Sequence, residues 1–367
     1  MRVGVLAYLL QSRRDYRAAG VSVYTEQLLR NLSSAAPHLA LTAFVPPDAP
    51  PLSAMAVRRA PISTHRSAVR IVWEQAAVPW LVRGQDVVHS TVNTLPLMAG
   101  RPTVLTIHDL SFLRFPDRLP PGRRAFLGAA VPVSARRATR VIAISESTKR
   151  DIVELLRVPE DRIRVVHQGV DARFRPGPSA VAGEYFGGRP YILHVGTLEP
   201  RKNIDLLVRA FSGLRRDGAP HVLALIGARG WMYEPLFHLV RSLGLEDHVR
   251  FLDYVPPDEL PRWYNGADLF AYPSAYEGFG LPVLEAMACG VPTVTSNASS
   301  LGEVAGTAAL TVEAGSDTDL RGAMARVLEN PSLAANLRQS GLVRAREFTW
   351  EKTARRTAEV YEEAARG

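Results

Sequence analysis

The sequence predicts an α/β protein built from two successive parallel-sheet domains. Apolar runs of strand length alternate with amphipathic stretches of helical spacing, which is the pattern of a parallel sheet wrapped by helices. The pattern is interrupted by Gly169, Pro176, Gly177 and Pro178, and it restarts at Tyr191. A length of 367 residues is enough for two or three domains with sizeable cores.

The composition is that of a globular protein, with 47% hydrophobic and 22% charged residues. The single cysteine, Cys289, excludes an internal disulfide and fits a reducing cytoplasm, and we expect it to be a packed thiol. The apolar N-terminal run is too short for a signal peptide, and no run approaches the ~20 apolar residues of a membrane span. We therefore expect a cytoplasmic chain, or one that is peripheral on the inner face of the cell membrane.

The net charge of +8 is unevenly distributed. Residues 1–170 carry 23 Lys and Arg against 12 Asp and Glu, whereas the remainder carries 21 against 24. A basic half attracts anionic lipid headgroups, a lipid diphosphate or nucleic acid. An arginine-rich composition with only three lysines explains the count equally well. No helix-turn-helix or aromatic RNA-binding motif is present, so a non-enzymatic nucleic-acid-binding protein is a remote alternative.

The expected elements follow the chain in order. Those of the first half are the strands Val3–Leu9, Leu39–Val45, Val87–His89, Thr103–Ile107 and Arg140–Ile144, and the helices Val23–Ser33, Arg66–Val82, Arg123–Ala138 and one capped by Ser145. Those of the second half are the strands Tyr191–Val195, His221–Ile226, Val249–Leu252 and Ala267–Tyr272, and the helices Ile204–Leu214 with Asn203 as its cap, Glu234–Leu243, one after Pro282, one after Asp319 and Trp350–Ala365. The Asp317 to Asp319 triplet favours helix capping over a metal site.

The stretch from Ala271 to Gly290, AYPSAYEGFGLPVLEAMACG, has the order strand, glycine loop, helix. Gly278 and Gly280 let backbone amides approach a ligand, and the N-terminus of the following helix favours an anion such as phosphate. Glu277 and Glu285 flank that positive end, and carboxylates repel phosphate but bind hydroxyls. Amides for phosphate and carboxylates for hydroxyls together indicate a nucleotide sugar, in which a diphosphate joins two polyols.

Other candidate residues lie where strands are expected to end, which is where open parallel sheets bind ligands. Gly20 follows the first strand, and His108 follows a later one, where an imidazole can contact hydroxyls. Gly196 with Arg201 and Lys202 concentrates positive charge at a helix start and suits a diphosphate. Solvated surface charges are the alternative explanation for the two cations.

Four ordered motifs resemble the signatures of the family 4 retaining glycosyltransferases. They are TIHDLSFLRFPD, VGTLEPRKNID, DYVPPDELPRWYNGADLF, and EGFGLPVLEAMACGVPTV with YPS before it and SSLGEVAG after it. The resemblance covers essentially the whole chain and implies a GT-B fold, in which two Rossmann-like domains with parallel sheets face each other across a cleft. It implies an acceptor-binding domain at residues 1–172, a nucleotide-sugar-binding domain at 173–349, and a C-terminal helix at 350–367 that crosses back to the first domain.

The same resemblance assigns catalytic roles. His108 contacts the transferred sugar near the reaction centre, and Arg201 and Lys202 neutralise the charge that grows on the departing diphosphate in place of a metal ion. Glu277 and the segment that follows it bind the sugar and the phosphate. That segment consists of Gly278, Phe279, Gly280 and Leu281.

The remaining implied roles concern the donor and the acceptor. Glu285 binds ribose hydroxyls, and Tyr254 and Val255 lie beside the nucleotide base, although Tyr254 is equally explained as a core residue. Asp109 either orients its loop or touches the acceptor. The glycines expected to approach the diphosphate are Gly20 and Gly196.

The activity that the resemblance implies is that of a retaining, metal-independent hexosyltransferase, with a nucleotide sugar as donor and no cofactor. The motifs look most like those of bacterial mannosyltransferases, so GDP-mannose is the expected donor, with UDP-glucose or UDP-N-acetylglucosamine as alternatives. The expected acceptor is a glycan or lipid-linked sugar in polysaccharide or glycolipid biosynthesis, with membrane contact through the basic half. A sugar-nucleotide epimerase or a phosphorylase would share the architecture.

Overall fold

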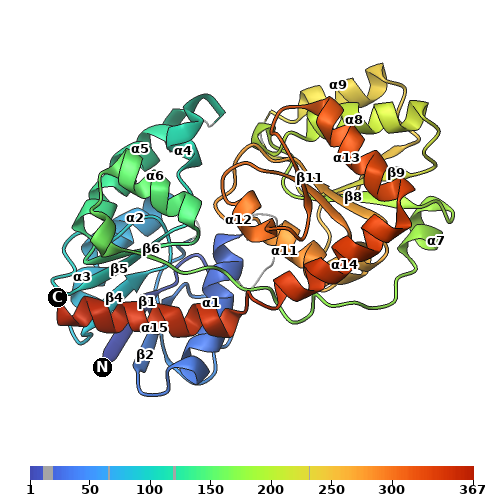
Figure 1. Cartoon of the computed structure of the whole chain (residues 1–367). Coiled ribbons are helices and arrows are strands. Elements are labelled where there is room, and N and C mark those ends of the chain that lie inside the picture. The colour runs from blue at the N-terminus through green and yellow to red at the C-terminus, as the bar shows by residue number, and fades with distance from the viewer. Residues whose placement is uncertain (11–19, 65–66, 119–120, 231) are drawn as a thin grey trace. The chain divides into compact units, whose positions relative to one another are not determined.

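The computed structural model describes residues 1–10, 20–64, 67–118, 121–230 and 232–367. It contains two compact units, one formed by Met1–Gly169 with Phe348–Gly367 and the other by Val170–Glu347. Each unit holds one parallel sheet wrapped by helices (Figure 1). The predicted α/β class with two parallel-sheet domains is therefore confirmed.

The first unit contains a seven-stranded sheet in the order β3-β2-β1-β4-β5-β6-β7, and every strand pair is parallel. The strand order reverses direction between β1 and β4, and ligands of open α/β sheets bind outside the carboxyl ends of strands at such a point. The strands are β1 (Arg2–Leu6), β2 (Ala40–Val45), β3 (Ala56–Arg59), β4 (Val87–Ser90), β5 (Thr103–Ile107), β6 (Arg140–Ala143) and β7 (Ile163–Val165).

The helices of this unit connect successive strands, apart from the last one. They are α1 (Val21–Ala35), α2 (Ser67–Ala76), α3 (Val78–Leu81), α4 (Ser111–Arg114), α5 (Pro121–Arg137), α6 (Glu146–Leu156) and the C-terminal α15 (Trp350–Arg366). Ser145 caps α6 as predicted, since its hydroxyl accepts the Thr148 amide at 3.0 Å. Arg66, where one expected helix begins, lies outside the described residues.

The C-terminal helix α15 packs along α1 and completes the first unit (Figure 1). The Tyr361 hydroxyl and the His89 Nδ1 atom, both buried, lie 2.7 Å apart. At the start of α15, the Thr353 hydroxyl donates to the His167 carbonyl at 2.7 Å. These contacts join residues at opposite ends of the sequence in one core.

The second unit contains a six-stranded parallel sheet in the order β10-β9-β8-β11-β12-β13, which reverses direction between β8 and β11. Its strands are β8 (Tyr191–Val195), β9 (Val222–Ile226), β10 (Val249–Phe251), β11 (Leu269–Tyr272), β12 (Thr293–Ser296) and β13 (Leu310–Val312). Its helices are α7 (Val181–Phe186), α8 (Ile204–Arg216), α9 (Glu234–Ser242), α10 (Leu260–Asn265), α11 (Leu281–Ala288), α12 (Leu301–Ala305), α13 (Asp317–Glu329) and α14 (Pro331–Ala345).

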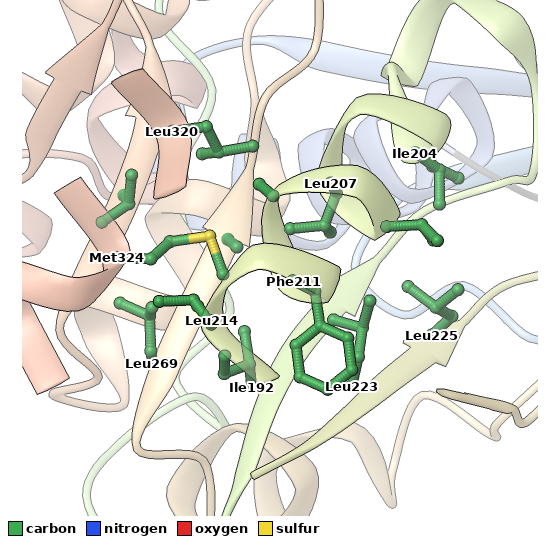
Figure 2. Close-up of a cluster of buried hydrophobic side chains, with 14 of the residues drawn as sticks. Ile192, Ile204, Leu207, Phe211, Leu214, Leu223, Leu225, Leu269, Leu320 and Met324 are labelled. Carbon is green, nitrogen blue, oxygen red and sulfur yellow. The ribbon is translucent and has the colours of Figure 1, made fainter. Parts of the chain in front are cut away.

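The core of the second unit lies between the sheet and α8 (Figure 2). Helix α8 buries one stripe at helical spacing because its apolar residues recur every three or four positions. Labelled members of this core are Ile192, Ile204, Leu207, Phe211, Leu214, Leu223, Leu225, Leu269, Leu320 and Met324. This packing fixes β8 and α8, and therefore the loop that joins them.

Two helix caps differ from the predictions. Asn203 precedes α8, but its side chain makes no capping bond and instead donates to the Pro273 carbonyl at 3.1 Å. Ser316 caps α13 by accepting the Asp319 amide at 3.1 Å, so Asp317 and Asp319 lie in the first turn instead of capping it. Both residue types favour a helix start, but the spacing alone does not say which oxygen meets the free amides.

The strands β3, β7, β12 and β13 are additional to those expected from the sequence, and each is only three or four residues long. β3, β7 and β13 lie at sheet edges, whereas β12 lies between β11 and β13. Separately, no helix among the described residues is long and apolar enough to cross a bilayer.

We predict that Gly169→Ala destabilises the first unit. A Cβ atom at residue 169 would lie 2.1 Å from the Trp350 backbone nitrogen, so the start of α15 would have to move. We expect a loss of about 1–3 kcal/mol in the free energy of unfolding, measured by chemical denaturation. Gly183→Ala on α7 is the control, because a Cβ atom there meets nothing within 4 Å. Equal stability of the two variants would contradict this account.

Candidate active site

The candidate site of the second unit lies at the carboxyl ends of β8 and β11, on either side of the point where the strand order reverses. The loop after β8 carries Arg201 and Lys202, and the loop after β11 carries Glu277. Main-chain contacts join the two loops: the Ala275 amide donates to the Arg201 carbonyl at 2.9 Å, and the Ser274 hydroxyl donates to it at 3.1 Å.

The structure brings Arg201, Lys202 and Glu277 together in one buried ion cluster. The Lys202 Nζ atom lies 2.6 Å from Glu277 Oε1, and an Arg201 guanidinium nitrogen lies 3.0 Å from Glu277 Oε2. Arg201 also contacts Glu199 Oε1 at 2.6 Å and donates to the Tyr276 carbonyl. These contacts exclude the alternative of two solvated surface cations.

Glu277 is ionised in this cluster. Burial alone would raise the pKa of its carboxyl, but Arg201 and Lys202 lower that pKa to about 2. The Tyr272 and Ser274 hydroxyls also donate to Oε1, at 3.0 and 2.7 Å. A carboxylate with this many donors is a weak base and a weak nucleophile.

Lys202 is the buried cation of the cluster. Burial lowers its pKa, and the Glu277 carboxylate opposes that effect. Gly196 lies beside the lysine, since a Cβ atom there would meet Lys202 Cε at 3.7 Å. The cluster therefore offers two cations and a nearby main chain to a diphosphate, while Glu199 and Glu277 balance the charge of the cations.

The glycine loop of the site is held in a fixed shape. Gly280 has a φ angle of 105°, which favours glycine, and a Cβ atom there would meet the Leu301 side chain at 2.7 Å. The Ser300 hydroxyl lies 2.9 Å from both the Glu277 and the Phe279 carbonyl oxygens. Helix α11 begins directly afterwards at Leu281, with a proline in its first turn as predicted.

Glu285 occupies a separate, half-buried position on α11. The Tyr264 hydroxyl donates to its Oε2 atom at 2.8 Å. Burial is the main cause that raises the pKa of Glu285 to about 7, and nearby Asp171 adds to the rise against the opposing effects of Tyr264 and Arg173. The two glutamates of the motif therefore differ in protonation near neutral pH.

Tyr254 and Val255 follow β10. Tyr254 is 40% exposed, so its explanation as a core residue is wrong, whereas Val255 is buried. An exposed ring at the carboxyl end of a strand can stack on a base, and the assignment of these two residues to the nucleotide base stays a prediction.

The predicted residues of the first unit gather near its own strand-order reversal. Buried His108 donates from Nε2 to the Thr91 carbonyl at 2.8 Å, which leaves Nδ1 as an acceptor. Burial lowers the pKa of this imidazole. The edge of its ring packs against Tyr24 on α1, the helix that Gly20 precedes.

Asp109 orients its own loop. Its Oδ1 atom accepts the Ser111 amide at 2.9 Å and the Ser111 hydroxyl at 2.6 Å. One of the two proposed roles is thus visible, and acceptor contact stays a prediction. The roles assigned to His108 and Gly20 also stay predictions.

His194 is a site residue that sequence reasoning missed. It is fully buried, stacks on Tyr272 at 5.3 Å, and donates from Nδ1 to the Ala271 carbonyl at 3.0 Å. Its Nε2 atom has no hydrogen-bond partner among the described residues, and a Cβ atom on Gly196 would lie 3.4 Å from it. Burial lowers its pKa to about 4, so the ring is a neutral acceptor. The sequence signal that could have identified His194 is a histidine within the otherwise apolar strand YILHV.

Other contributors that the sequence did not single out are hydroxyl groups. Tyr272, Ser274, Ser299 and Ser300 bond the Glu277 side chain or main chain. YPS and SSLGEVAG contain them, but serine and tyrosine are too common to be recognised as ligands of a particular carboxylate. Across the described ranges, no cluster of His, Cys, Asp and Glu could hold a metal ion.

Comparisons with known families cover both units. A family described as "Glycosyl transferases group 1" matches residues 182–343, and one described as "Glycosyltransferase Family 4" matches residues 18–174.

Two characterised relatives are similar over most of the chain. The O-antigen chain mannosyltransferase B of Escherichia coli is 35% identical over 264 residues, which are 70% of this chain and 69% of that protein. The D-inositol 3-phosphate glycosyltransferase of Acidothermus cellulolyticus is 34% identical over 284 residues, 72% of this chain. The chain spans 62% of the length of that second relative.

Solved structures share the fold of the whole chain. Sucrose-phosphate synthase from Thermosynechococcus elongatus has a TM-score of 0.80 at 21% identity and covers 99% of this chain and 98% of its own. Anabaena HepE in complex with UDP and glucose has a TM-score of 0.79 at 18% identity, with 99% and 100% coverage. WaaG, a glycosyltransferase involved in lipopolysaccharide biosynthesis, has a TM-score of 0.74 at 16% identity, with 98% and 99% coverage.

We predict that Glu285 lowers the free energy of unfolding as the pH rises. Its pKa is 4.5 in the unfolded chain and about 7 when folded, so its protonated form contributes stability below pH 4.5 that is lost as pH rises through 7. Between pH 5 and 8.5, the unfolding free energy of the wild type should fall relative to Glu285→Gln by up to about 3 kcal/mol.

Denaturation curves at several pH values measure this difference. Glu329→Gln, at an exposed position at the end of α13, is the control and should follow the wild type. If Glu285→Gln also follows the wild type across the range, the buried carboxyl does not have the raised pKa.

Proposed function

This chain belongs to the glycosyl transferases group 1 family, and from that premise we propose that it is a retaining, metal-independent mannosyltransferase that uses GDP-mannose. The family and the relatives make it a glycosyltransferase of the GT-B fold. The observation that supports a metal-independent transfer from a nucleotide sugar is the buried cluster of Arg201, Lys202 and Glu277 beside Gly196. That cluster supplies cations for a diphosphate and a carboxylate for sugar hydroxyls in one place.

The proposed reaction proceeds on one face of the sugar. The bond between the anomeric carbon and the diphosphate oxygen breaks, and its electron pair leaves with the diphosphate. Arg201 and Lys202 stabilise the growing negative charge, as pre-positioned cations do in other active sites. An acceptor hydroxyl then bonds to the anomeric carbon from the same side, and the departing phosphate takes its proton.

Glu277 is not the nucleophile in this proposal. Its carboxylate accepts hydrogen bonds from Lys202, Tyr272 and Ser274, and its pKa of about 2 makes it a poor attacking group. We assign it instead to the hydroxyls of the transferred sugar. Its ionised state suits that role, because a carboxylate only accepts hydrogen bonds, and Oε2, with Arg201 as its cation, carries fewer donors than Oε1.

Glu285 and the residues after β10 complete the proposed donor site. Glu285 binds the ribose hydroxyls, and Tyr254 and Val255 lie beside the base. Burial raises the pKa of Glu285, and two ribose hydroxyls would stabilise its ionised form. Nucleotide binding should then release a proton near neutral pH.

The choice of mannose rests on the names of relatives. An O-antigen mannosyltransferase is 35% identical, whereas D-inositol 3-phosphate glycosyltransferases are 34% and 36% identical. UDP-glucose or UDP-N-acetylglucosamine is the second candidate, supported by the structural similarity to HepE, which was solved with UDP and glucose. For the acceptor we propose a glycan or a lipid-linked sugar, at the inner face of the cell membrane.

A thermal-shift screen tests the donor. We expect GDP to raise the melting temperature, with a further rise from GDP-mannose, because a ligand that binds only the folded state stabilises it by about 2.7 kcal/mol at a hundred times its Kd. UDP, ADP, dTDP and their sugars are the comparisons. A response to UDP alone would contradict mannose as the transferred sugar, and no response to any nucleotide would contradict the assigned site.

We predict that Lys202→Ala folds but transfers sugar about 10²–10³-fold more slowly than the wild type. Arg201 still neutralises Glu277 in this variant, so the fold persists while one cation at the diphosphate is lost. Glu285→Ala should also lose most transfer, through weaker nucleotide binding. Turnover of radiolabelled donor measures both, with the exposed Lys352→Ala as the control. Wild-type turnover by either variant would remove that residue from the site.

A further inference from the structure

Among the exposed large apolar side chains of the first unit, three lie on α3 and in the connection from β4 to β5. Met98 is 77% exposed, Trp80 is 64% exposed and Leu97 is 37% exposed. Trp80 lies on α3, and the other two lie in the connection from β4 to β5. Exposed apolar residues that occur singly need no explanation, but a group of them marks an interaction site.

Three arginines join these side chains into one surface. The Arg83 guanidinium lies 3.5 Å from the centre of the Trp80 ring. Arg101 donates to the Arg83 carbonyl at 2.7 Å, and Arg137 donates to the Leu97 carbonyl at 3.4 Å. We call these residues the Trp80 surface, which comprises Trp80, Arg83, Leu97, Met98, Arg101 and Arg137.

The backbone beneath the Trp80 surface is well supported. The Gln75 side chain of α2 donates to the Leu95 carbonyl at 2.8 Å and accepts the Leu97 amide at 3.0 Å. These two bonds fix the β4 to β5 connection against α2. The fold therefore holds Leu97 and Met98 outward and does not bury them, although both are apolar.

The charge of this surface is positive and uncompensated. Arg83, Arg101 and Arg137 form no ion pair within the part of the chain that the structure describes, and all three are exposed. Asp86, the acidic residue nearest to Arg83 in the sequence, forms an ion pair with Arg2 at 3.1 Å. The guanidinium groups thus remain available to external anions.

The Trp80 surface is separate from the candidate site of its own unit. Arg83 precedes β4, Arg101 precedes β5 and Arg137 precedes β6, so all three lie at the amino ends of strands. His108 and Asp109 follow the carboxyl end of β5, at the opposite edge of the sheet. Docking through this surface would leave the site residues free.

We propose that the Trp80 surface docks this chain onto an anionic lipid bilayer. Tryptophan favours the interface between headgroups and acyl chains, methionine and leucine can enter the apolar layer, and arginines bind anionic headgroups. This inference extends the proposed function, in which the acceptor is lipid-linked, and names the surface that makes the contact.

Two other occupants fit the surface less well. A second copy of the chain related by a two-fold axis would bring the same arginines against one another, and like charges repel. Nucleic acid would match the arginines but would leave Leu97 and Met98 without a role. A bilayer with anionic headgroups satisfies both the apolar and the charged members.

Sedimentation with vesicles tests the proposal. We expect the full chain to bind vesicles of phosphatidylcholine with about a third phosphatidylglycerol, and to bind pure phosphatidylcholine at least about tenfold more weakly. Trp80→Ser with Met98→Ser should weaken binding to the anionic vesicles at least about tenfold. Arg83→Gln with Arg101→Gln and Arg137→Gln should do the same and remove the salt dependence.

Matched controls come from the second unit. Val343→Ser removes an exposed apolar side chain and Arg326→Gln removes an exposed arginine, and both should sediment like the wild type. No binding of the wild type to anionic vesicles, or equal binding of the Trp80 and Val343 variants, would overturn the proposal. So would binding of duplex DNA in preference to vesicles, or a dimer in solution that Trp80→Ser dissolves.

The thermal shift with nucleotides separates this inference from the proposed function. The Trp80 and Met98 variant should keep the full nucleotide response, because its substitutions lie outside the candidate site. A nucleotide response without vesicle binding would remove only the docking surface. Vesicle binding without any nucleotide response would remove only the proposed donor site.

Discussion

Glu277 stays ionised in a buried position because Arg201 and Lys202 contact its two carboxylate oxygens from a different loop. Burial of that charge without a cation would be costly, so the loop after β8 and the loop after β11 depend on each other. The Ala275 amide and the Ser274 hydroxyl both donate to the Arg201 carbonyl and hold the same two loops together. The two loops therefore keep their arrangement because they share the Glu277 carboxylate, which one loop carries and the other neutralises.

The second carboxylate of the motif is connected to the first by aromatic rings. Tyr264, which donates to Glu285, packs at 5.4 Å on Phe270, and Phe270 stacks at 5.8 Å on Tyr272, which donates to Glu277. The pKa is about 7 for Glu285, where burial dominates, and about 2 for Glu277, where Arg201 and Lys202 contact the carboxylate. Three packed aromatic rings thus lie between Glu285, which can be protonated near neutral pH, and Glu277, which stays ionised.

The sequence predicted the elements that make long apolar runs and the residues that belong to motifs. Strands β5 and β8 have the predicted bounds, and Ser145 caps its helix. Strands β12 and β13 were missed because TVTS and LTV are short and mix apolar residues with polar threonine and serine, so neither forms a clear apolar run. His194 was missed for a different reason. Its Nε2 atom is buried without a hydrogen-bond partner only because β8 and β11 pair in the folded sheet, and the sequence does not show that pairing.

The charge asymmetry of the sequence follows the division into units, because residues 1–169 belong to the first unit and 170–347 to the second. Both units contain arginines in ion pairs, such as Arg114 with Asp151 in the first and Arg321 with Asp217 in the second. Several arginines of the first unit also donate to neutral carbonyls, where they support connections between strands. Examples are Arg59 to Pro47 and Ala49, Arg101 to Arg83, Arg137 to Leu97, and Arg162 to Arg136 and Ala138. A carbonyl partner satisfies the guanidinium donors but contributes no negative charge, so the field of the first unit stays positive and long-ranged.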